Sequence, residues 1–358
     1  MPVTIRQLLE ELIQRNATDL HLTTGAPPMF RIDGDLVPTN YELMTPELIQ
    51  QLVYSILNDQ QKKKFEMEWE LDFSISIAGL SRFRGNIFLQ RGSVTAALRT
   101  IPFEIRGFKE LGVPLVVQEL AGRPKGLILV TGPTGCGKST TLAAIIDKVN
   151  SERRGHIITV EEPIEYLFRH KKAIVNQRQV GSDTKSFANA LKYALREDPD
   201  VVMVGEMRDA ETTGTTLTIA ETGHLTMATL HTNSAAESLH RIIDMFPPYQ
   251  QGQVRAQLAF VVEGVVTQQL LPKIGGGRVL AVEVMVATPA IRALIRDKKE
   301  HQIYSAIQSG QKHGMQTMNQ ALYELFNKRL ITLETAFDYS PNQEEFEHMV
   351  EQKSTLPA

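Results

Sequence analysis

The chain has 358 residues, of which 42% are hydrophobic and 22% are charged, an ordinary balance for a folded protein and unlike that of a disordered or fibrous chain. The 38 lysines and arginines against 41 aspartates and glutamates leave a net charge of −3, so no overall field draws the chain to nucleic acid or anionic lipid. The only cysteine, Cys136, excludes a disulfide framework and a zinc site built on paired cysteines.

The apolar runs and the lone cysteine indicate the cellular location that we expect for the chain. Residues 1–10 have no long apolar core after a basic start, and no stretch of the sequence approaches roughly 18 uninterrupted apolar residues. We therefore expect neither a secretion signal nor a membrane span. A single cysteine fits a reducing compartment, so the expected location is the cytoplasm.

The first hundred residues predict a small α+β domain. Thr4 and Gln7 have the spacing of a capping box, and apolar side chains follow at helical intervals. Short alternating runs come next, such as residues 82–90, and glycines separate them. We place an N-terminal domain at residues 1–100 and a linker at 101–114, where prolines and glycines interrupt any long regular element.

The next region alternates apolar runs with helical patterns, which is typical of an α/β domain. Four runs have the composition of buried parallel strands: residues 126–131, 157–160, 201–204 and 225–230. We expect the α/β domain to span residues 115–287. A mostly helical region should follow at 288–358.

A phosphate-binding loop follows the first of these runs. The sequence from Gly132 to Ser139 matches the Walker A pattern GxxxxGK[ST], with an apolar run before it and a helical pattern after it. Backbone N–H groups of such a loop surround a β-phosphate, Lys138 can reach the β- and γ-phosphates, and the Ser139 hydroxyl can bind Mg²⁺. The predicted ligands are therefore ATP and Mg²⁺. The candidate binding residues are Gly132, Pro133, Thr134, Gly135, Cys136, Gly137, Lys138, Ser139 and Thr140.

Two apolar runs end in acidic residues, as a nucleotide-hydrolysing site requires. The run at 157–160 leads into Glu161 and Glu162, and either carboxylate could polarise the attacking water. The run at 201–204 leads to Glu206, which we expect to act on Mg²⁺, through water. An acidic residue after a single strand is usually a helix cap or a solvated loop, but two such residues after a phosphate loop favour the functional interpretation.

Histidines and arginines complete the set of candidates. His224 and His231 stand at opposite ends of the run at 225–230, and both are candidate catalytic residues, with His231 favoured because it lies at the carboxyl end. Their separation along a strand argues against a shared metal site. Arg82 and Arg84 should share one face of a strand, with Arg99 at the end of the next extended run; that face could clamp a phosphate or could be a solvated edge.

Together these segments resemble the secretion and pilus motor ATPase family, whose four signatures are a Walker A loop, an aspartate-rich box, a Walker B strand and a histidine box. One further segment is similar to the AIRxLIR motif of the pilus-retraction branch of that family. Its residues are Ala290, Ile291, Arg292, Leu294, Ile295 and Arg296. Read without the resemblance, Thr288 would cap a packed surface helix with Pro289 in its first turn. Cys136 stands where the family usually has serine, and Glu162 where it usually has aspartate, so the choice between Glu161 and Glu162 stays open, with Glu161 preferred because it should end the strand itself.

The resemblance implies a PAS-like N-terminal domain, a RecA-like P-loop domain with a helical C-terminal region, and a homo-hexameric ring with ATP held between the domains. It also implies that Arg82, Arg84 and Arg99 reach the phosphates. The implied function is an ATP-hydrolysing motor that powers type IV pilus retraction and twitching motility. Such a motor would act on an inner-membrane platform or adaptor protein, at the cytoplasmic face of the inner membrane.

Three other functions fit parts of the pattern. An assembly or secretion motor of the same family would use the same chemistry, and a nucleotide-gated scaffold would bind ATP without turnover. A nucleic-acid motor fits poorly, because no basic stretch with interleaved aromatic residues occurs. The carboxylates of Glu161, Glu162 and Glu206 argue against the scaffold.

Overall fold

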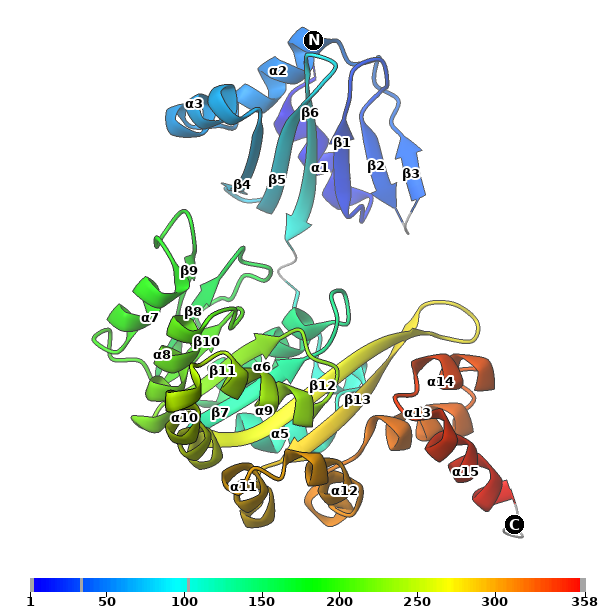
Figure 1. The fold of residues 1–358 in the computed structure, drawn as a ribbon. Helices are drawn as coiled ribbons and strands as arrows, with labels where there is room; N and C mark the ends of the chain where they lie inside the picture. Colours follow the sequence, from blue (N-terminus) through cyan, green and yellow to red (C-terminus); the bar gives the residue numbers. More distant parts are fainter. Residues whose placement is uncertain (1–2, 33–34, 102–103, 355–358) are drawn as a thin grey trace. The chain divides into compact units, whose positions relative to one another are not determined.

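The computed structural model describes residues 3–32, 35–101 and 104–354 (Figure 1). Residues 102–103 of the predicted linker, 1–2 and 33–34 of the predicted N-terminal domain, and 355–358 at the end of the predicted helical region lie outside the described residues. The chain divides into two compact units. The first comprises Met1–Glu104 with Glu165–Leu167, and the second comprises Ile105–Ile164 with Phe168–Ala358.

The first unit is a six-stranded antiparallel sheet in the order β3-β2-β1-β6-β5-β4 with three helices. Its elements are α1 (Ile5–Gln14), β1 (Asp19–Leu22), β2 (Met29–Ile32), β3 (Asp35–Pro38), α2 (Pro46–Tyr54), α3 (Asp59–Glu68), β4 (Glu70–Ile77), β5 (Ser81–Gln90) and β6 (Ser93–Ile101). The predicted capping box is confirmed, because the side chains of Thr4 and Gln7 each accept a hydrogen bond from the other residue's backbone N–H.

One face of this sheet carries the apolar core of the first unit. Leu20 and Phe83 from the strands lie in one apolar cluster with Leu8 of α1 and Ile49 of α2, and all four side chains are fully buried. Because strand side chains alternate between faces, the intervening positions lie on the other face, where charged residues occur.

The second unit is built on a seven-stranded sheet in the order β13-β12-β7-β11-β10-β8-β9. Its strands are β7 (Gly126–Thr131), β8 (His156–Glu161), β9 (Ile174–Gln179), β10 (Val201–Val204), β11 (Leu225–Leu230), β12 (Val262–Pro272) and β13 (Arg278–Val286). Its first helices are α4 (Phe108–Leu111), α5 (Leu115–Ala121), α6 (Lys138–Glu152), α7 (Phe187–Ala194), α8 (Ala210–Glu221), α9 (Ala235–Asp244) and α10 (Pro248–Val261). The described part of the predicted linker therefore contains a short helix, α4.

All four predicted strands are present, and β7, β10 and β11 have the predicted limits. They pair in parallel, in the order β7-β11-β10-β8. Alternate residues of β7 enter different cores: Leu127 and Leu129 pack with α8, α9 and α10, whereas Ile128 and Val130 pack with α5 and α6. Both faces of the sheet are thus covered, which is why these strands read as continuous apolar runs.

The C-terminal region is helical, as its pattern predicted. Its helices are α11 (Pro289–Arg296), α12 (Ile303–Gln308), α13 (Met318–Asn327), α14 (Leu333–Tyr339) and α15 (Gln343–Ser354). Helices α11 and α12 join the core formed with α8, α9 and α10, whereas α13 to α15 form a separate cluster against the hairpin of β12 and β13. Figure 1 shows this last group of helices beside that hairpin.

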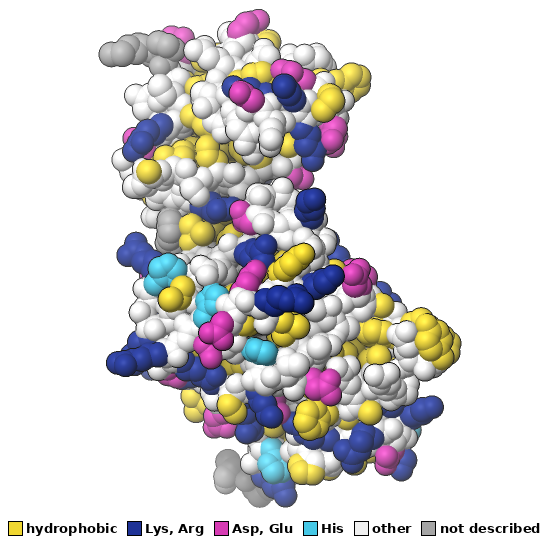
Figure 2. Space-filling view, turned by 90° about the vertical axis from the view of Figure 1, so that its left-hand side faces the viewer, with side chains coloured by type: hydrophobic (Ala, Val, Ile, Leu, Met, Phe, Trp, Pro, Cys, Tyr) yellow, Lys and Arg dark blue, Asp and Glu magenta, His cyan; other side chains and the backbone are white. Residues whose placement is uncertain are grey.

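Two surface properties follow from these elements. Among the described residues, no helix is both long enough and apolar enough to span a membrane. On the face drawn in Figure 2, acidic and basic side chains are interspersed rather than gathered into one basic tract. That distribution agrees with the near-balanced formal charge of the sequence.

Candidate nucleotide-hydrolysis site

The phosphate loop joins the carboxyl end of β7 to the amino end of α6. Gly132 has a φ of 136°, and a Cβ atom there would lie 2.4 Å from the Gln268 carbonyl oxygen and 2.6 Å from the Cys136 Sγ, so only glycine fits. Lys138 Nζ donates to the carbonyl oxygens of Gly132 at 2.8 Å and Pro133 at 3.0 Å. The lysine therefore lies folded over the loop, at the end of the helix that should face a phosphate.

Cys136 is a buried residue within this loop. Its side chain is 3% exposed, and burial raises the pKa of its thiol above the ordinary value. A thiol that stays protonated is a weak nucleophile. The cysteine therefore behaves as a small packing residue beneath Gly132.

Glu161 ends β8, as predicted, and is buried. Its Oε1 accepts hydrogen bonds from the Thr159 hydroxyl at 2.6 Å and from the Gln177 side-chain amide at 3.1 Å. The carbonyl oxygen of that amide accepts the N–H of Phe168 at 2.9 Å, which fixes the orientation of the amide. Glu161 is thus held by neighbours on β8 and β9.

Glu162 and Glu206 are linked by one arginine. Arg208 Nη1 lies 2.9 Å from Glu162 Oε2, and Arg208 Nε lies 2.7 Å from Glu206 Oε2. The hydrogen bond to Glu206 raises the pKa of Arg208, so its charge is secure. Two carboxylates from neighbouring strand ends are thereby held together in spite of their like charge.

His231 lies between Glu206 and the phosphate loop. Its Nε2 lies 3.4 Å from Glu206 Oε1, and its Nδ1 lies 3.5 Å from the Thr134 hydroxyl. Because β7, β11, β10 and β8 are parallel neighbours, the residues after them meet at one edge of the sheet. The structure therefore brings together the phosphate loop, Glu162, Glu206 and His231, with Glu161 at the end of the adjacent β8.

His224 is not brought to this edge. It directly precedes β11, whose first residue, Leu225, is in register with Gly126 at the start of β7. Its ring Nδ1 contacts the Ile219 carbonyl oxygen at 3.0 Å and the Thr222 hydroxyl at 3.1 Å. At roughly 3.3 Å per strand residue, the length of β11 separates the two histidines, so we leave His224 out of the proposed catalytic set.

The predicted arginine face belongs to the first unit. Arg84 on β5 and Arg99 on β6 are direct cross-strand partners, and Arg82 lies two residues from Arg84 on the same face. Arg99 Nε donates to the carboxylate of Asp19 at 2.7 Å, and the Arg31 side chain approaches the same carboxylate at 4.0 Å. Part of the Arg99 guanidinium is therefore already engaged within this sheet.

The retraction-like motif forms α11, with Thr288 as its cap and Pro289 in its first turn, as predicted. Ile291 and Ile295 are fully buried, and Leu294 packs partly against the same core. Ala290 and Arg296 are exposed. The motif is thus mainly a packed helix with a small exposed face.

Arg292 of this motif holds the end of α10. Its guanidinium donates to the carbonyl oxygens of Ala259 at 2.9 Å and Phe260 at 2.7 Å, in the last turn of that helix. It also pairs with Glu263 at 2.7 Å. Arg292 is therefore occupied inside the unit, which the sequence pattern did not reveal.

Two residues of the site, Arg208 and Gln177, were not predicted to have a role. Arg208 is the second residue after Glu206, so its position in the sequence could have identified it. Two carboxylates that are expected to converge are stabilised by a nearby cation. Gln177 carried no sequence signal, because nothing in a single sequence shows that β9 pairs with β8.

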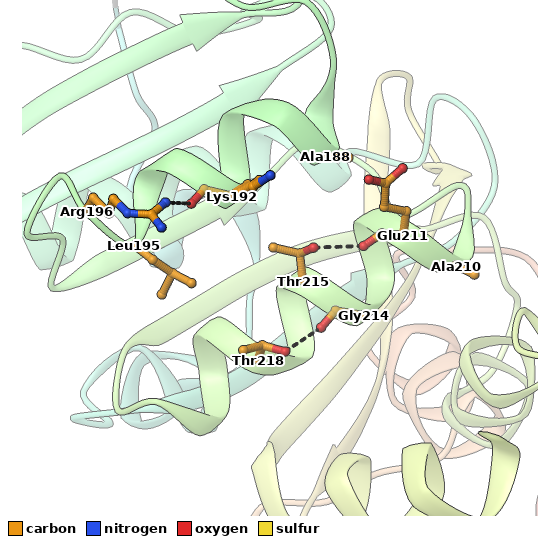
Figure 3. Close-up of a pocket in the computed structure, with 9 residues that line it drawn as sticks. All are labelled: Ala188, Lys192, Leu195, Arg196, Ala210, Glu211, Gly214, Thr215 and Thr218. Carbon is orange, nitrogen blue, oxygen red and sulfur yellow. Dashed lines mark hydrogen bonds between the residues drawn. The ribbon is translucent and has the colours of Figure 1, made fainter.

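A separate cavity of about 600 Å³ lies between α7 and α8 (Figure 3). Lys192 and Arg196 form one wall, and the Thr215 and Thr218 hydroxyls of the other wall donate to carbonyl oxygens of their own helix at 2.9 Å each. The residues that line it are Ala188, Lys192, Leu195, Arg196, Ala210, Glu211, Gly214, Thr215 and Thr218. None of the predicted site residues lines this cavity.

The donor set at the sheet edge suits Mg²⁺ with a nucleotide. Within the described residues, no group of three or more His, Cys, Asp or Glu side chains is arranged to hold a metal by itself. Mg²⁺ prefers oxygen ligands and usually keeps waters and phosphate oxygens, so one hydroxyl from Ser139 and one carboxylate from Glu206 fit it.

The strand order, the loop between β7 and α6, and the acidic strand ends define a RecA-like P-loop nucleotide-binding domain, preceded by a PAS-like α+β unit. The chain belongs to the type II/IV secretion system protein family, whose family model matches residues 1–337. The resemblance read from the motifs is therefore confirmed.

Similarity to individual proteins extends over nearly the whole chain. The type IV pilus retraction ATPase PilT of Pseudomonas aeruginosa is 48% identical over 96% of this chain and 99% of that protein. A twitching motility protein of Neisseria gonorrhoeae is 46% identical over 88% of this chain and 85% of that protein. A crystal structure of the pilus retraction motor PilT with bound ADP has 54% identity and a TM-score of 0.92, and covers 97% of this chain and 100% of that chain.

A secretion ATPase is similar over a smaller part. Type II secretion system protein E of Aeromonas hydrophila is 36% identical over 67% of this chain, and the match covers 49% of that protein. The match to the retraction ATPase, by contrast, covers both chains almost completely.

Proposed function

We propose that this chain is an ATP-hydrolysing motor that powers retraction of a type IV pilus, and hence twitching motility. The observation that carries the ATPase part is the meeting of the phosphate loop, Glu206 and His231 at one sheet edge. The retraction part is supported by 48% identity to the Pseudomonas aeruginosa retraction ATPase over 96% of the chain.

The chemistry is argued from the chain's own groups. The N–H groups of the loop and the Lys138 ammonium would hold the β- and γ-phosphates. Ser139 and, through water, Glu206 would hold Mg²⁺, which neutralises charge on the phosphates. His231, whose ring nitrogens approach Thr134 and Glu206, would change its contacts when the γ-phosphate leaves.

The group that activates water is one of two carboxylates. Glu161 ends its strand but is buried and accepts two side-chain hydrogen bonds, which makes it a well-oriented group. Glu162 is exposed and paired with Arg208. Replacing each carboxylate in turn by glutamine distinguishes the two candidates. The variant at the residue that activates water should lose turnover but keep ATP binding. Glu165→Gln, which changes an exposed carboxylate in the same segment, is the third variant of this test. Loss of turnover in that variant alone would reject both Glu161 and Glu162.

The mechanical cycle we propose needs a ring of six copies. Arg82, Arg84 and Arg99 of the first unit would contact the phosphates during this cycle. Hydrolysis would release those contacts and let the units move. The ring would work at the cytoplasmic face of the inner membrane, without spanning it, and would act on a platform or adaptor protein there.

Deleting the gene tests the direction of work. A retraction motor leaves cells with excess surface pili that cannot twitch, because assembly continues without removal. An assembly or secretion motor leaves cells without pili or without the secreted proteins. Complementation with the parent and with Lys138→Ala distinguishes loss of turnover from loss of the polypeptide.

A further inference from the structure

Four buried hydroxyl side chains lie in a row beneath the phosphate loop. Thr232 Oγ1 lies 2.7 Å from Ser238 Oγ, which lies 3.4 Å from Thr131 Oγ1, and Thr131 Oγ1 lies 2.9 Å from Thr267 Oγ1. Thr131, Ser238 and Thr267 are fully buried, and Thr232 is 5% exposed. The row crosses from the segment after β11, through α9, to β7 and β12.

The two catalytic segments adjoin this row. Thr131 is the last residue of β7 and is followed directly by Gly132 of the phosphate loop. Thr232 directly follows His231. Ser238 hydrogen-bonds to Thr232 at 2.7 Å and packs against Thr131 at 3.4 Å, so it lies between the backbone that carries His231 and the base of the phosphate loop.

The hydroxyl hydrogen of Ser238 decides the direction of its contact with Thr232. Ser238 has one hydroxyl hydrogen, and it donates this hydrogen to its nearest acceptor, the Ser234 carbonyl oxygen at 2.7 Å; Thr131 Oγ1, at 3.4 Å, is a packing neighbour. The Thr232 hydroxyl must therefore be the donor in its contact with Ser238. Removing the Ser238 hydroxyl would leave the buried Thr232 hydroxyl without that acceptor.

Ser238 is itself held in place. It lies in the first turns of α9, whose first residue, Ala235, donates its N–H to the buried carboxylate of Glu283 on β13 at 2.8 Å. The Ser234 hydroxyl caps the same helix by accepting from Glu237 N–H at 3.1 Å. The start of α9 is thus a fixed support.

His231 lacks comparable support of its own. Its side chain is 44% exposed, and its two contacts, at 3.4 Å and 3.5 Å, are long for hydrogen bonds. The place of its ring consequently depends on the backbone at residues 231–232. That backbone is anchored through Thr232 and Ser238.

We propose that Ser238 is a positioning residue for ATP hydrolysis, which holds the His231 segment against the base of the phosphate loop. The inference rests on the proposed ATPase function and deepens it. Ser238 is fully buried, and it acts through Thr232 and His231. A purely structural serine would instead affect stability alone.

The test compares Ser238→Ala with Thr216→Val. Thr216 is also fully buried and also donates to the carbonyl oxygen four residues earlier, at 2.7 Å, but it lies on α8 outside the row. We expect Ser238→Ala to lower kcat roughly tenfold while ADP affinity stays within about twofold, because a small misplacement of a catalytic group lowers the rate more than the binding. Thr216→Val should change neither quantity.

A double-mutant cycle with His231→Ala gives a sharper readout. If Ser238 acts through His231, adding Ser238→Ala to His231→Ala should lower kcat no further. Thr232→Val, which keeps the shape of the side chain, should reproduce the kcat loss if Ser238→Ala fails to fold. Equal kcat for Ser238→Ala and Thr216→Val, or fully additive losses in the cycle, would overturn the proposal. An inactive parent protein would instead reject the proposed function.

Discussion

Arg208 is the residue on which the acidic side of the site depends. Its guanidinium contacts Glu162 at 2.9 Å and Glu206 at 2.7 Å, with a different nitrogen to each. A planar fork can serve two carboxylates in this way, whereas the ammonium of lysine is a single point charge. The two carboxylates would otherwise repel each other at the edge where a negatively charged nucleotide must bind.

We predict that Arg208→Gln lowers kcat by about tenfold and raises the Mg²⁺ concentration needed for half-maximal rate, because Glu206 loses its orienting partner. Arg208→Lys should recover only part of the loss. Steady-state ATPase assays over a Mg²⁺ titration measure both effects. Rates within about twofold of the parent in both variants would mean that the contacts are an ordinary exposed ion pair.

At the scale of elements, helix ends and strand faces decide how the site is supported. On β12, Thr267 pairs with Thr131 of β7, while the next residue, Gln268, points to the other face and donates to the Thr141 hydroxyl of α6 at 2.7 Å. One strand thus contacts the residue before the phosphate loop on one face of the sheet and the helix after the loop on the other. Arg292 stabilises the end of α10, because its guanidinium donates to the last carbonyl oxygens of that helix.

Arg292 and Arg296 form a matched pair for the retraction-like motif. Arg292→Ala should lower the free energy of unfolding by about 1–3 kcal/mol, because two helix-end carbonyls and Glu263 lose a charged donor. Arg296→Ala, at an exposed position, should leave stability within about 0.5 kcal/mol of the parent. Denaturant unfolding of both variants measures this. Equal stabilities would contradict the assigned contacts.

The buried carboxyl group of Glu283 makes the stability of the fold depend on pH. Burial raises the pKa of its carboxyl in the folded chain, against the opposing N–H groups of Ala235 and Met318. With the folded pKa above the unfolded one, the unfolded chain loses its proton first as the pH rises, so the contribution of Glu283 to stability falls over that range. Above the folded pKa, no further change is expected.

The stability of the Glu283→Gln variant, compared with that of the parent, should therefore increase as the pH rises. The melting temperature of the variant minus that of the parent should increase between about pH 5 and about pH 8. Thermal melts of both proteins in matched buffers measure this difference, in which other titrating groups cancel. A difference that stays flat or decreases would contradict the raised pKa.

At the scale of the whole molecule, much of the second unit could be predicted from the sequence. Buried parallel strands are short apolar runs, so β7, β10 and β11 were recognised with their limits, and β8 with one residue missing at each end. The phosphate loop and the capping residue Thr288 were recognised because each depends on side chains that are neighbours in the sequence.

What could not be predicted depends on partners distant in sequence. The pairing of β9 with β8 places Gln177 beside Glu161, and no local pattern encodes it. The engagement of Arg292 with the end of α10 depends on a residue separation of more than thirty. His224 was included as a candidate because it flanks the same strand as His231, although only His231 lies at the carboxyl end, where a parallel sheet carries its site.

The measurement that tests the account most directly is steady-state ATP hydrolysis by the purified protein, with the mass of the assembly determined on the same samples. The parent should hydrolyse ATP as a ring, and Lys138→Ala and Glu206→Ala should lose turnover without losing fold. Lys192→Ala, an exposed lysine on α7, should retain the parent rate. A parent protein that binds ATP without hydrolysing it would contradict the motor and leave a nucleotide-gated scaffold.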